Sequence, residues 1–185
     1  MPSSRHTPLA EALMRLDADG HTLVLRRIMP ADVEPMLAFQ RGLSFGDRYF
    51  RYGTPAYQPS QEDIQRQCSA DPEESRHFIV VAHRQDRARI VAAADCCMRL
   101  EADACEFAIL VDAAWRRRGL ARWLLGHLVD CAREQGLRRM VGKTLGSNLA
   151  MLGLARGAGF TLLDGGEGPA IATLSLSLDG TELPV

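Results

Sequence analysis

Short apolar runs separated by turn signals predict strands along most of the chain. The runs are rich in β-branched and aromatic residues, which is typical of strands. They cover residues 21–29, 77–82, 90–97, 105–111, 139–145, 160–163 and 171–178. A charged turn at 84–87 joins the second and third runs, and a turn at 101–103 leads into the fourth. The pattern therefore predicts an antiparallel start to a sheet.

Apolar residues at helical spacing predict the helices between these strands. Leu120, Leu124 and Leu128 recur on one face, and Gly136 supplies a C-terminal stop. Other helices are predicted to begin at Pro30, to run from Ser60 (an N-cap) to 68, and to cover 149–158. The helix after Leu120 would carry the chain across the sheet between two parallel strands.

The first 20 residues carry a separate helical pattern. Leu9, Leu13 and Leu16 have helical spacing, and the pattern ends near Gly20. We expect an N-terminal appendage over 1–20 that packs on the domain or on a partner subunit. The remainder, 21–185, is predicted to be one α+β domain, since it contains no repeat, low-complexity tract or second domain.

Composition and charge narrow the possible functions. The 185 residues include 22 basic and 23 acidic side chains, a formal net charge of −1, so nothing indicates a nucleic-acid partner. No apolar stretch is long enough to span a membrane, and the N-terminus lacks the apolar core of a signal peptide. The expected location is the cytoplasm.

The cysteine and histidine patterns predict neither disulfides nor a metal site. The five cysteines are odd in number, without C-x-x-C spacing, and Cys96 and Cys97 should point to opposite faces of a strand. We expect buried, reduced thiols. The five histidines form no H-x-x-x-H pair, so no metal is predicted.

The segment 115–122, which we call the arginine–glycine loop, has the composition of an anion site. It joins the strand 105–111 to the long helix, so unpaired backbone N–H groups and the positive end of the helix dipole meet there. A glycine permits close approach of a ligand, and arginines add full charges. The candidate residues are Arg116, Arg117, Arg118, Gly119, Leu120, Ala121 and Arg122. A solvated basic turn before an ordinary surface helix is the alternative.

Glu106 is the candidate catalytic residue. On a strand, Glu106 faces the same way as Ala108 and Leu110, which would partly desolvate its carboxylate. A lysine amine, with a pKa near ~10.4, must lose a proton before it can attack an acyl group. Glu106 could accept that proton, or it could be a surface strand residue paired with an arginine.

The motifs around this loop resemble those of the GNAT N-acetyltransferases. Arg116-x-x-Gly119-x-Ala121 after an apolar strand is similar to the acyl-CoA pyrophosphate loop of that family. Residues 148–160, with Asn148, Met151 and the pair Gly159-Phe160, are similar to the helix that follows in the family. The resemblance extends from about residue 21 to 178. It implies a mixed, mostly antiparallel, centrally splayed sheet of about six to seven strands with helices on both faces.

The resemblance also implies how acetyl-CoA binds as co-substrate. The pyrophosphate would bind at the arginine–glycine loop, and the pantetheine would lie along the strand edge at Ile109, Leu110 and Val111. Backbone groups there would pair with its amides, and a backbone N–H would polarise the thioester carbonyl. Asn148 matches a polar contact to the pantetheine, with a helix N-cap as its alternative role.

One branch of the family is especially similar. Glu106-Phe107-Ala108, Met151 and Arg48-Tyr49-x-Arg51 resemble the acetyltransferase domain of bacterial protein-lysine acetyltransferases that modify acyl-CoA synthetases. There the residue matching Glu106 is the general base. Many GNAT enzymes have a tyrosine acid where this chain has Ala155, so the CoA thiolate would leave without a side-chain acid.

The resemblance leaves the role of an aromatic cluster open. Tyr49, Phe50 and Tyr52 could line the acceptor cleft or belong to the core.

The sequence thus predicts an acetyl-CoA-dependent N-acetyltransferase, with direct attack by the acceptor amine and Glu106 as base. The expected acceptor is a protein lysine, for example on an acyl-CoA synthetase. Acetylation of a small amine and a non-catalytic acyl-CoA-binding regulator are the alternatives. The chain could form a homodimer.

Overall fold

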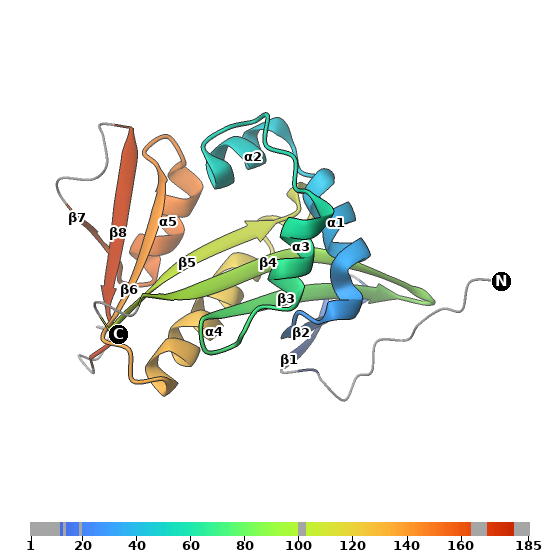
Figure 1. Ribbon diagram of the computed structural model, residues 1–185, viewed down its shortest axis with the longest axis horizontal. Coiled ribbons are helices and arrows are strands. Elements are labelled where there is room, and N and C mark those ends of the chain that lie inside the picture. Colours follow the sequence, from blue (N-terminus) through green and yellow to red (C-terminus); the bar gives the residue numbers. More distant parts are fainter. Residues whose placement is uncertain (1–11, 13, 19, 100–102, 164–169, 180–185) are drawn as a thin grey trace.

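The computed structural model describes residues 12, 14–18, 20–99, 103–163 and 170–179, and these form one eight-stranded sheet (Figure 1). Its strand order is β1-β2-β3-β4-β5-β6-β8-β7. Every neighbouring pair is antiparallel except β5 and β6, which are parallel. The strands are β1 (Met14–Ala18), β2 (His21–Arg27), β3 (Ser75–Arg84), β4 (Arg87–Arg99), β5 (Ala104–Val111), β6 (Arg139–Leu145), β7 (Thr161–Leu163) and β8 (Ile171–Ser177).

In the described part of the chain, five α-helices and two short 3₁₀ turns connect these strands. In Figure 1, α1 and α3 lie on one face of the sheet and α4 on the other. The helices are α1 (Val33–Arg41), α2 (Phe45–Tyr52), α3 (Gln61–Cys68), α4 (Leu120–Glu134) and α5 (Leu149–Gly157), with 3₁₀ turns at Pro30–Asp32 and Ala113–Trp115. None of the described helices is long and apolar enough to cross a membrane.

The hydrophobic core has two parts, one on each face of the sheet. One cluster packs α1 and α3 on β3 and β4, with Met36, Ile64 and Ile79 almost fully buried. The other packs α4 and α5 on the opposite face, around Leu124 and Leu128. The predicted α+β architecture, with helices on both faces and one crossover through α4, is confirmed.

The predicted N-terminal helix is wrong where the structure describes it. Residues 14–18 form β1, an antiparallel partner of β2, and the rest of that prediction falls on residues 1–11, 13 and 19, outside the described part. Helical and alternating patterns are hard to separate over so few residues, and pairing with β2 decides the outcome. The strands from β2 onward number seven, within the expected six to seven, and β1 makes the eighth.

The sheet forks between β5 and β6. The two strands pair over only three positions, from Ala104 with Arg139 to Glu106 with Val141. Beyond Glu106, among the described residues, no strand pairs with β5 on the β6 side. The ring of Phe107, 5% exposed, fills the base of the fork and lies 5.2 Å from the ring of Phe160.

Gly142 leaves space for the ring of Phe107 because it has no side chain. A Cβ at position 142 would lie 2.8 Å from Cζ of Phe107, much closer than real contacts allow. We expect Gly142→Ala to lower the free energy of unfolding by about 1–3 kcal/mol, as overpacking of a core does. Denaturant unfolding would measure it. Gly153→Ala in α5 is the matched control, because its Cβ meets nothing within 4 Å. Equal stability of both variants would contradict the packing described.

Candidate active site

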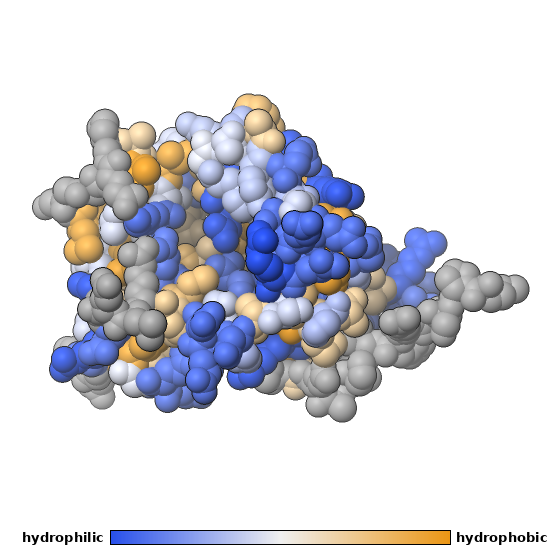
Figure 2. Space-filling view, viewed as in Figure 1, coloured by the Kyte–Doolittle hydropathy of each residue, from blue (hydrophilic) through white to orange (hydrophobic). Residues whose placement is uncertain are grey.

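A cavity of about 840 Å³ opens where β5 and β6 diverge. Its volume is in the range of small-molecule sites, and its walls come from α2, β4, β5, the arginine–glycine loop, β6 and the start of α5. Figure 2 shows the molecule hollowed below α2. The lining joins apolar side chains such as Leu110 and Met151 with charged ones such as Arg51 and Glu106. A crevice at the carboxyl ends of parallel strands is a common place for a ligand.

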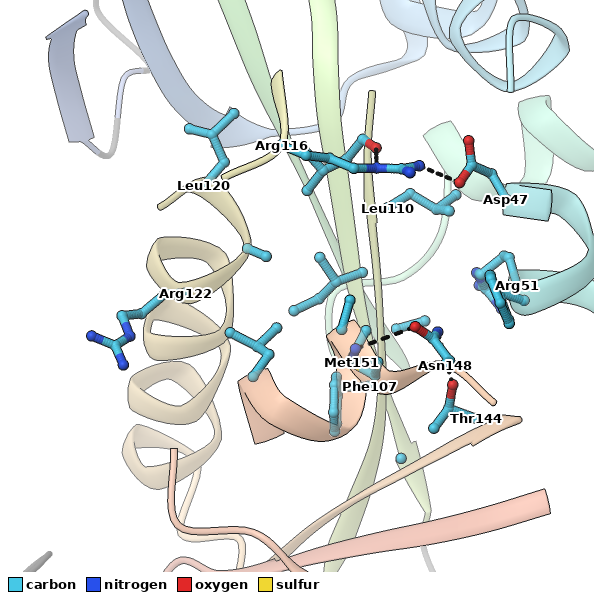
Figure 3. Close-up of a pocket in the computed structure, with 18 of the residues that line it drawn as sticks. Asp47, Arg51, Phe107, Leu110, Arg116, Leu120, Arg122, Thr144, Asn148 and Met151 are labelled. Atoms are coloured by element: carbon cyan, nitrogen blue, oxygen red, sulfur yellow. Dashed lines mark hydrogen bonds and ion pairs between the residues drawn. The ribbon is translucent and has the colours of Figure 1, made fainter. Parts of the chain in front are cut away.

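The arginine–glycine loop forms the wall at the start of α4. Gly119 is the N-cap of this helix with φ of 82°, and Arg117 also has a positive φ of 57°. No described side chain caps the first turn, so its backbone N–H groups remain available to an anion. Six of the seven predicted loop residues line the cavity: Arg116, Arg117, Gly119, Leu120, Ala121 and Arg122. Arg122 is turned away from the other labelled side chains in Figure 3.

Arg118 is the predicted loop residue that does not line the cavity. Its guanidinium lies over the ring of Trp115, 5.0 Å from the centroid. Trp115 is 3% exposed, and His21 meets the same ring edge-on. Arg118 therefore makes a cation–π contact with Trp115 that stabilises the loop.

Arg116 links the loop to α2. Its Nη2 forms an ion pair with Asp47 Oδ1, and its Nε donates to the carbonyl oxygen of Val111 at 3.3 Å (Figure 3). Asp47 also lines the cavity. The charged part of the loop is thus in direct contact with the helix on the other side of the cavity.

The predicted pantetheine residues also line the cavity. Ile109, Leu110 and Val111 lie on the part of β5 that β6 no longer covers. Asn148 caps α5 by accepting from the N–H of Met151 at 3.2 Å, and it donates to Thr144 Oγ1 at 3.1 Å. The N-cap role is therefore present, and the side chain still faces the cavity.

Glu106 stands at the point where the fork opens. It is half-buried, lines the cavity and lies directly opposite Cys97 on β4. Because opposite residues of antiparallel strands share a face, Glu106 and Cys97 point to the α1 side of the sheet, with Asp95 two residues along. A carboxylate and the arginine–glycine loop thus belong to the same cavity.

Asp95 and Arg51 form a half-buried ion pair beside Glu106. Arg51 Nη2 lies 3.3 Å from Asp95 Oδ1. Burial lowers the pKa of Arg51, but the charge and hydrogen bond of Asp95, together with the nearby Tyr52 and Cys97, more than offset it, and the pKa lies above its usual value. Arg51 stays charged and neutralises Asp95.

Cys97 differs from the expected buried thiol. Cys68, Cys96, Cys105 and Cys131 are buried as predicted, whereas Cys97 is exposed on the cavity wall. Partial desolvation and the charge of Asp95 raise the pKa of the Cys97 thiol. Since the thiolate is the reactive form, this cysteine is a weak nucleophile at neutral pH.

A series of hydrogen bonds connects the helices beside the cavity to the sheet. Tyr52 donates to Gln40 at 3.0 Å, and Gln40 donates to Gln67 at 3.1 Å. His77 lies 3.3 Å from Gln67 and 3.0 Å from Ser75 through its two ring nitrogens. Burial lowers the pKa of His77, and desolvation raises the pKa of Tyr52 to about 12, so both stay neutral near pH 7. These hydrogen bonds link α1, α2 and α3 to β3.

Other residues singled out from the sequence take different places. Phe50 lines the cavity, whereas Tyr49 is exposed outside it and Tyr52 packs against the core. Ala155 is fully buried in the core and does not line the cavity. In the described part of the chain, no three His, Cys, Asp or Glu residues are placed to hold a metal.

Sequence reasoning did not identify α2, nor did it identify Asp47 and Asp95 as residues of the site. Ser44 and Asp47 form the same capping box as Ser60 and Asp63. The S-x-x-D spacing would have predicted a helix at 45 and drawn attention to Asp47. Asp95, an acidic residue between buried neighbours on a central strand, was a second available signal.

Comparisons with known proteins agree with this geometry. The model of the acetyltransferase (GNAT) family matches residues 43–160, more than half of the chain. Acetyltransferase PA5475 of Pseudomonas aeruginosa PAO1 is 29% identical over 145 residues, which cover 77% of this chain and 76% of the relative.

Solved structures with the same fold include the GNAT domain of S. lividans PAT. It is 26% identical, with a TM-score of 0.76, over 88% of this chain and 96% of that domain. A spermidine N-acetyltransferase from Vibrio cholerae, in complex with CoA and spermine, has a TM-score of 0.68 at 14% identity. The match covers 84% of this chain and 95% of that one.

Proposed function

Because the chain belongs to the acetyltransferase (GNAT) family, whose members use acetyl-CoA as co-substrate, we propose that it acetylates the side-chain amine of a protein lysine. One observation carries the proposal. The carboxylate of Glu106 and the arginine–glycine loop line the same cavity, with Glu106 at the start of the unpaired part of β5 and the loop after its end. A base, an anion site and a strand edge are the parts that acetyl transfer from acetyl-CoA requires.

In this proposal acetyl-CoA binds along the loop and β5. The pyrophosphate accepts hydrogen bonds from the first-turn N–H groups of α4, with the charges of Arg116 and Arg117 beside it. The pantetheine amides pair with the backbone of 109–111 as an added strand would. Asn148, which lines the cavity near the end of β6, is the polar contact for this arm.

Glu106 acts as the general base. The acceptor lysine is mostly protonated at pH 7, and its nitrogen becomes a nucleophile when Glu106 takes a proton. The nitrogen then attacks the thioester carbonyl carbon, whose oxygen is stabilised by a backbone N–H of β5. The C–S bond breaks and CoA leaves as the thiolate. The attacking nitrogen loses its second proton to solvent, and N-acetyl-lysine forms. The thiolate of CoA needs no side-chain acid, which is consistent with a buried alanine at 155.

The charges around the acceptor side support a lysine on a protein. Three carboxylates line the cavity, but Asp47 is paired with Arg116 and Asp95 with Arg51. A strongly acidic pocket, suited to a small polycation, is therefore not formed. Arg51, Phe107 and Met151, part of the motifs that resemble those of protein-lysine acetyltransferases, all line the cavity.

A screen with purified protein tests the acceptor. The chain would be incubated with acetyl-CoA and an acyl-CoA synthetase, and in parallel with spermidine and free lysine, and CoA release would be followed with a thiol reagent. We expect release with the protein acceptor and one acetylated lysine in its peptide map. Release with small amines alone would favour the small-amine alternative, and binding of acetyl-CoA without transfer would favour a regulator.

A variant of Cys97 tests whether transfer is direct. Cys97 is the exposed thiol of the cavity, and an acetyl-cysteine intermediate would have to form on it. Because its pKa is raised, we expect Cys97→Ala to keep turnover within about threefold of wild type, in contrast to loss of a true nucleophile. Steady-state rates and intact-protein mass would check this. An acetylated Cys97 that turns over on adding acceptor would contradict direct attack.

A further inference from the structure

Charged contacts hold the N-terminal half of α2 against the cavity. None of the eight residues of α2, all of which the structure describes, is buried. The helix nevertheless places Phe50 and Arg51 on the cavity wall. The ion pairs of Asp47 with Arg116 and of Arg51 with Asp95 tie it to the loop and to the sheet. Tyr52 anchors the C-terminal end of the helix by packing against the core and donating to Gln40, and the ion pairs hold the rest of it beside the cavity.

Asp47 uses its two carboxylate oxygens for different purposes. Its Oδ2 accepts from the hydroxyl of Ser44 at 2.7 Å and from the N–H of Ser44 at 3.3 Å, which closes the cap of α2. Its Oδ1 pairs with Nη2 of Arg116, across the upper part of Figure 3. The Asp47 side chain is 11% exposed and that of Arg116 is 47% exposed. The carboxylate is shielded, whereas the guanidinium remains open to a ligand.

A carboxylate in this place opposes the binding of an anion. Arg116 belongs to the wall where the pyrophosphate is proposed to bind, and Asp47 both neutralises its charge and repels a phosphate. An anion site alone would be better without Asp47. We therefore attribute the ion pair to the placement of α2. Arg116 takes part both in this ion pair and in the proposed pyrophosphate site.

We propose that Asp47 is a positioning residue: through Arg116 it holds α2 over the acceptor side of the cavity, and it weakens acetyl-CoA binding in doing so. The inference rests on the proposed binding of acetyl-CoA at the arginine–glycine loop. Asp47 touches no reacting atom, and it acts through the placement of Phe50 and Arg51.

Asp47→Asn separates the two effects. The asparagine oxygen can still accept from the Ser44 N–H, but the charge opposite Arg116 is gone. We expect acetyl-CoA to bind about two- to fivefold tighter by calorimetry, the change typical of losing one partly exposed charge interaction. The KM for the acceptor should rise about threefold or more, while kcat stays within about twofold, because α2 loses an anchor and the reacting groups do not change. Tighter binding of acetyl-CoA together with a higher KM for the acceptor would support the proposal.

Two further variants control for the helix cap. Asp63→Asn makes the same change in the equivalent cap of α3, where Asp63 accepts from Ser60 Oγ at 2.7 Å and does not line the cavity. It should change neither acetyl-CoA binding nor acceptor KM. Asp47→Glu keeps the charge and should restore most of the acceptor KM.

The outcomes distinguish this proposal from the proposed function. Unchanged or weaker acetyl-CoA binding in Asp47→Asn, or an unchanged acceptor KM, would overturn the role of Asp47 while the loop assignment stands. If a folded Gly119→Val protein also bound acetyl-CoA normally, the loop assignment itself would fail.

Discussion

Glu106→Gln should lower turnover at pH 7 by about 10²–10⁴-fold, the usual contribution of a general base, and leave acetyl-CoA affinity nearly unchanged. Glutamine keeps the size and the hydrogen-bonding oxygen of glutamate but accepts no proton. The residue is half-buried on a paired part of β5, so the substitution should not disturb the sheet. Steady-state kinetics with the acceptor and calorimetry with acetyl-CoA measure the two quantities.

The effect of Glu106→Gln on turnover should depend on pH. As pH rises toward the amine's own pKa, near ~10.4 for lysine, neutral amine forms without a base. The difference between wild type and Glu106→Gln should therefore shrink with rising pH. Glu134→Gln, the same change on exposed residue 134 of α4, is the control and should behave as wild type at every pH. Wild-type turnover of Glu106→Gln at pH 7 would make Glu106 a structural residue. Loss of acetyl-CoA binding together with turnover would point to a damaged fold.

Gly119→Val should abolish measurable acetyl-CoA binding, with at least about a hundredfold loss, while the protein stays folded. The Cβ at 119 would meet no protein atom within 4 Å, so it would project into the space open to a ligand. A backbone that must approach a pyrophosphate closely tolerates only glycine there. The φ of 82° adds strain for a β-branched residue.

Gly136→Val separates strain from ligand exclusion. Gly136 has φ of 71° and equally open space at its Cβ, but it lies past the far end of α4. Both variants should lose similar stability, about 1–2 kcal/mol from the left-handed conformation, and only Gly119→Val should lose binding by calorimetry. Normal acetyl-CoA affinity in folded Gly119→Val would contradict the pyrophosphate assignment.

The elements that the sequence predicted well are those with strong local signals. Strand β6 was predicted with its observed bounds, and α3 with Ser60 as its N-cap, which is a local signal for the start of a helix. The arginine–glycine loop was placed correctly since it joins two clear elements, β5 and α4. Six of its seven predicted residues line the cavity, although the side chain of Arg122 is turned away from the others (Figure 3).

The predictions differ from the structure where contacts between residues distant in the sequence determine the conformation. At β1, pairing with β2 overrides a helical spacing. At Arg118, local sequence cannot tell a phosphate ligand from an arginine that stacks on Trp115. Tyr49 and Phe50 are neighbours, and only the seating of α2 through Asp47 and Arg51 puts one inside the cavity and the other outside. The fork itself depends on Gly142 and Phe107, 35 positions apart in the chain, fitting each other.

If acetyl-CoA binds along β5 as proposed, the supply of ligand would also determine how long the protein survives in a cell. The uncovered edge of β5 lacks the hydrogen bonds of a neighbouring strand, and a pantetheine arm paired there would act as that neighbour. A ligand that binds only the folded chain stabilises it in proportion to the logarithm of its concentration. Acetyl-CoA and CoA carry the same pantetheine, so both would protect the chain from proteases. The amount of enzyme would then follow the total CoA pool, whereas its rate would follow the acetylated fraction.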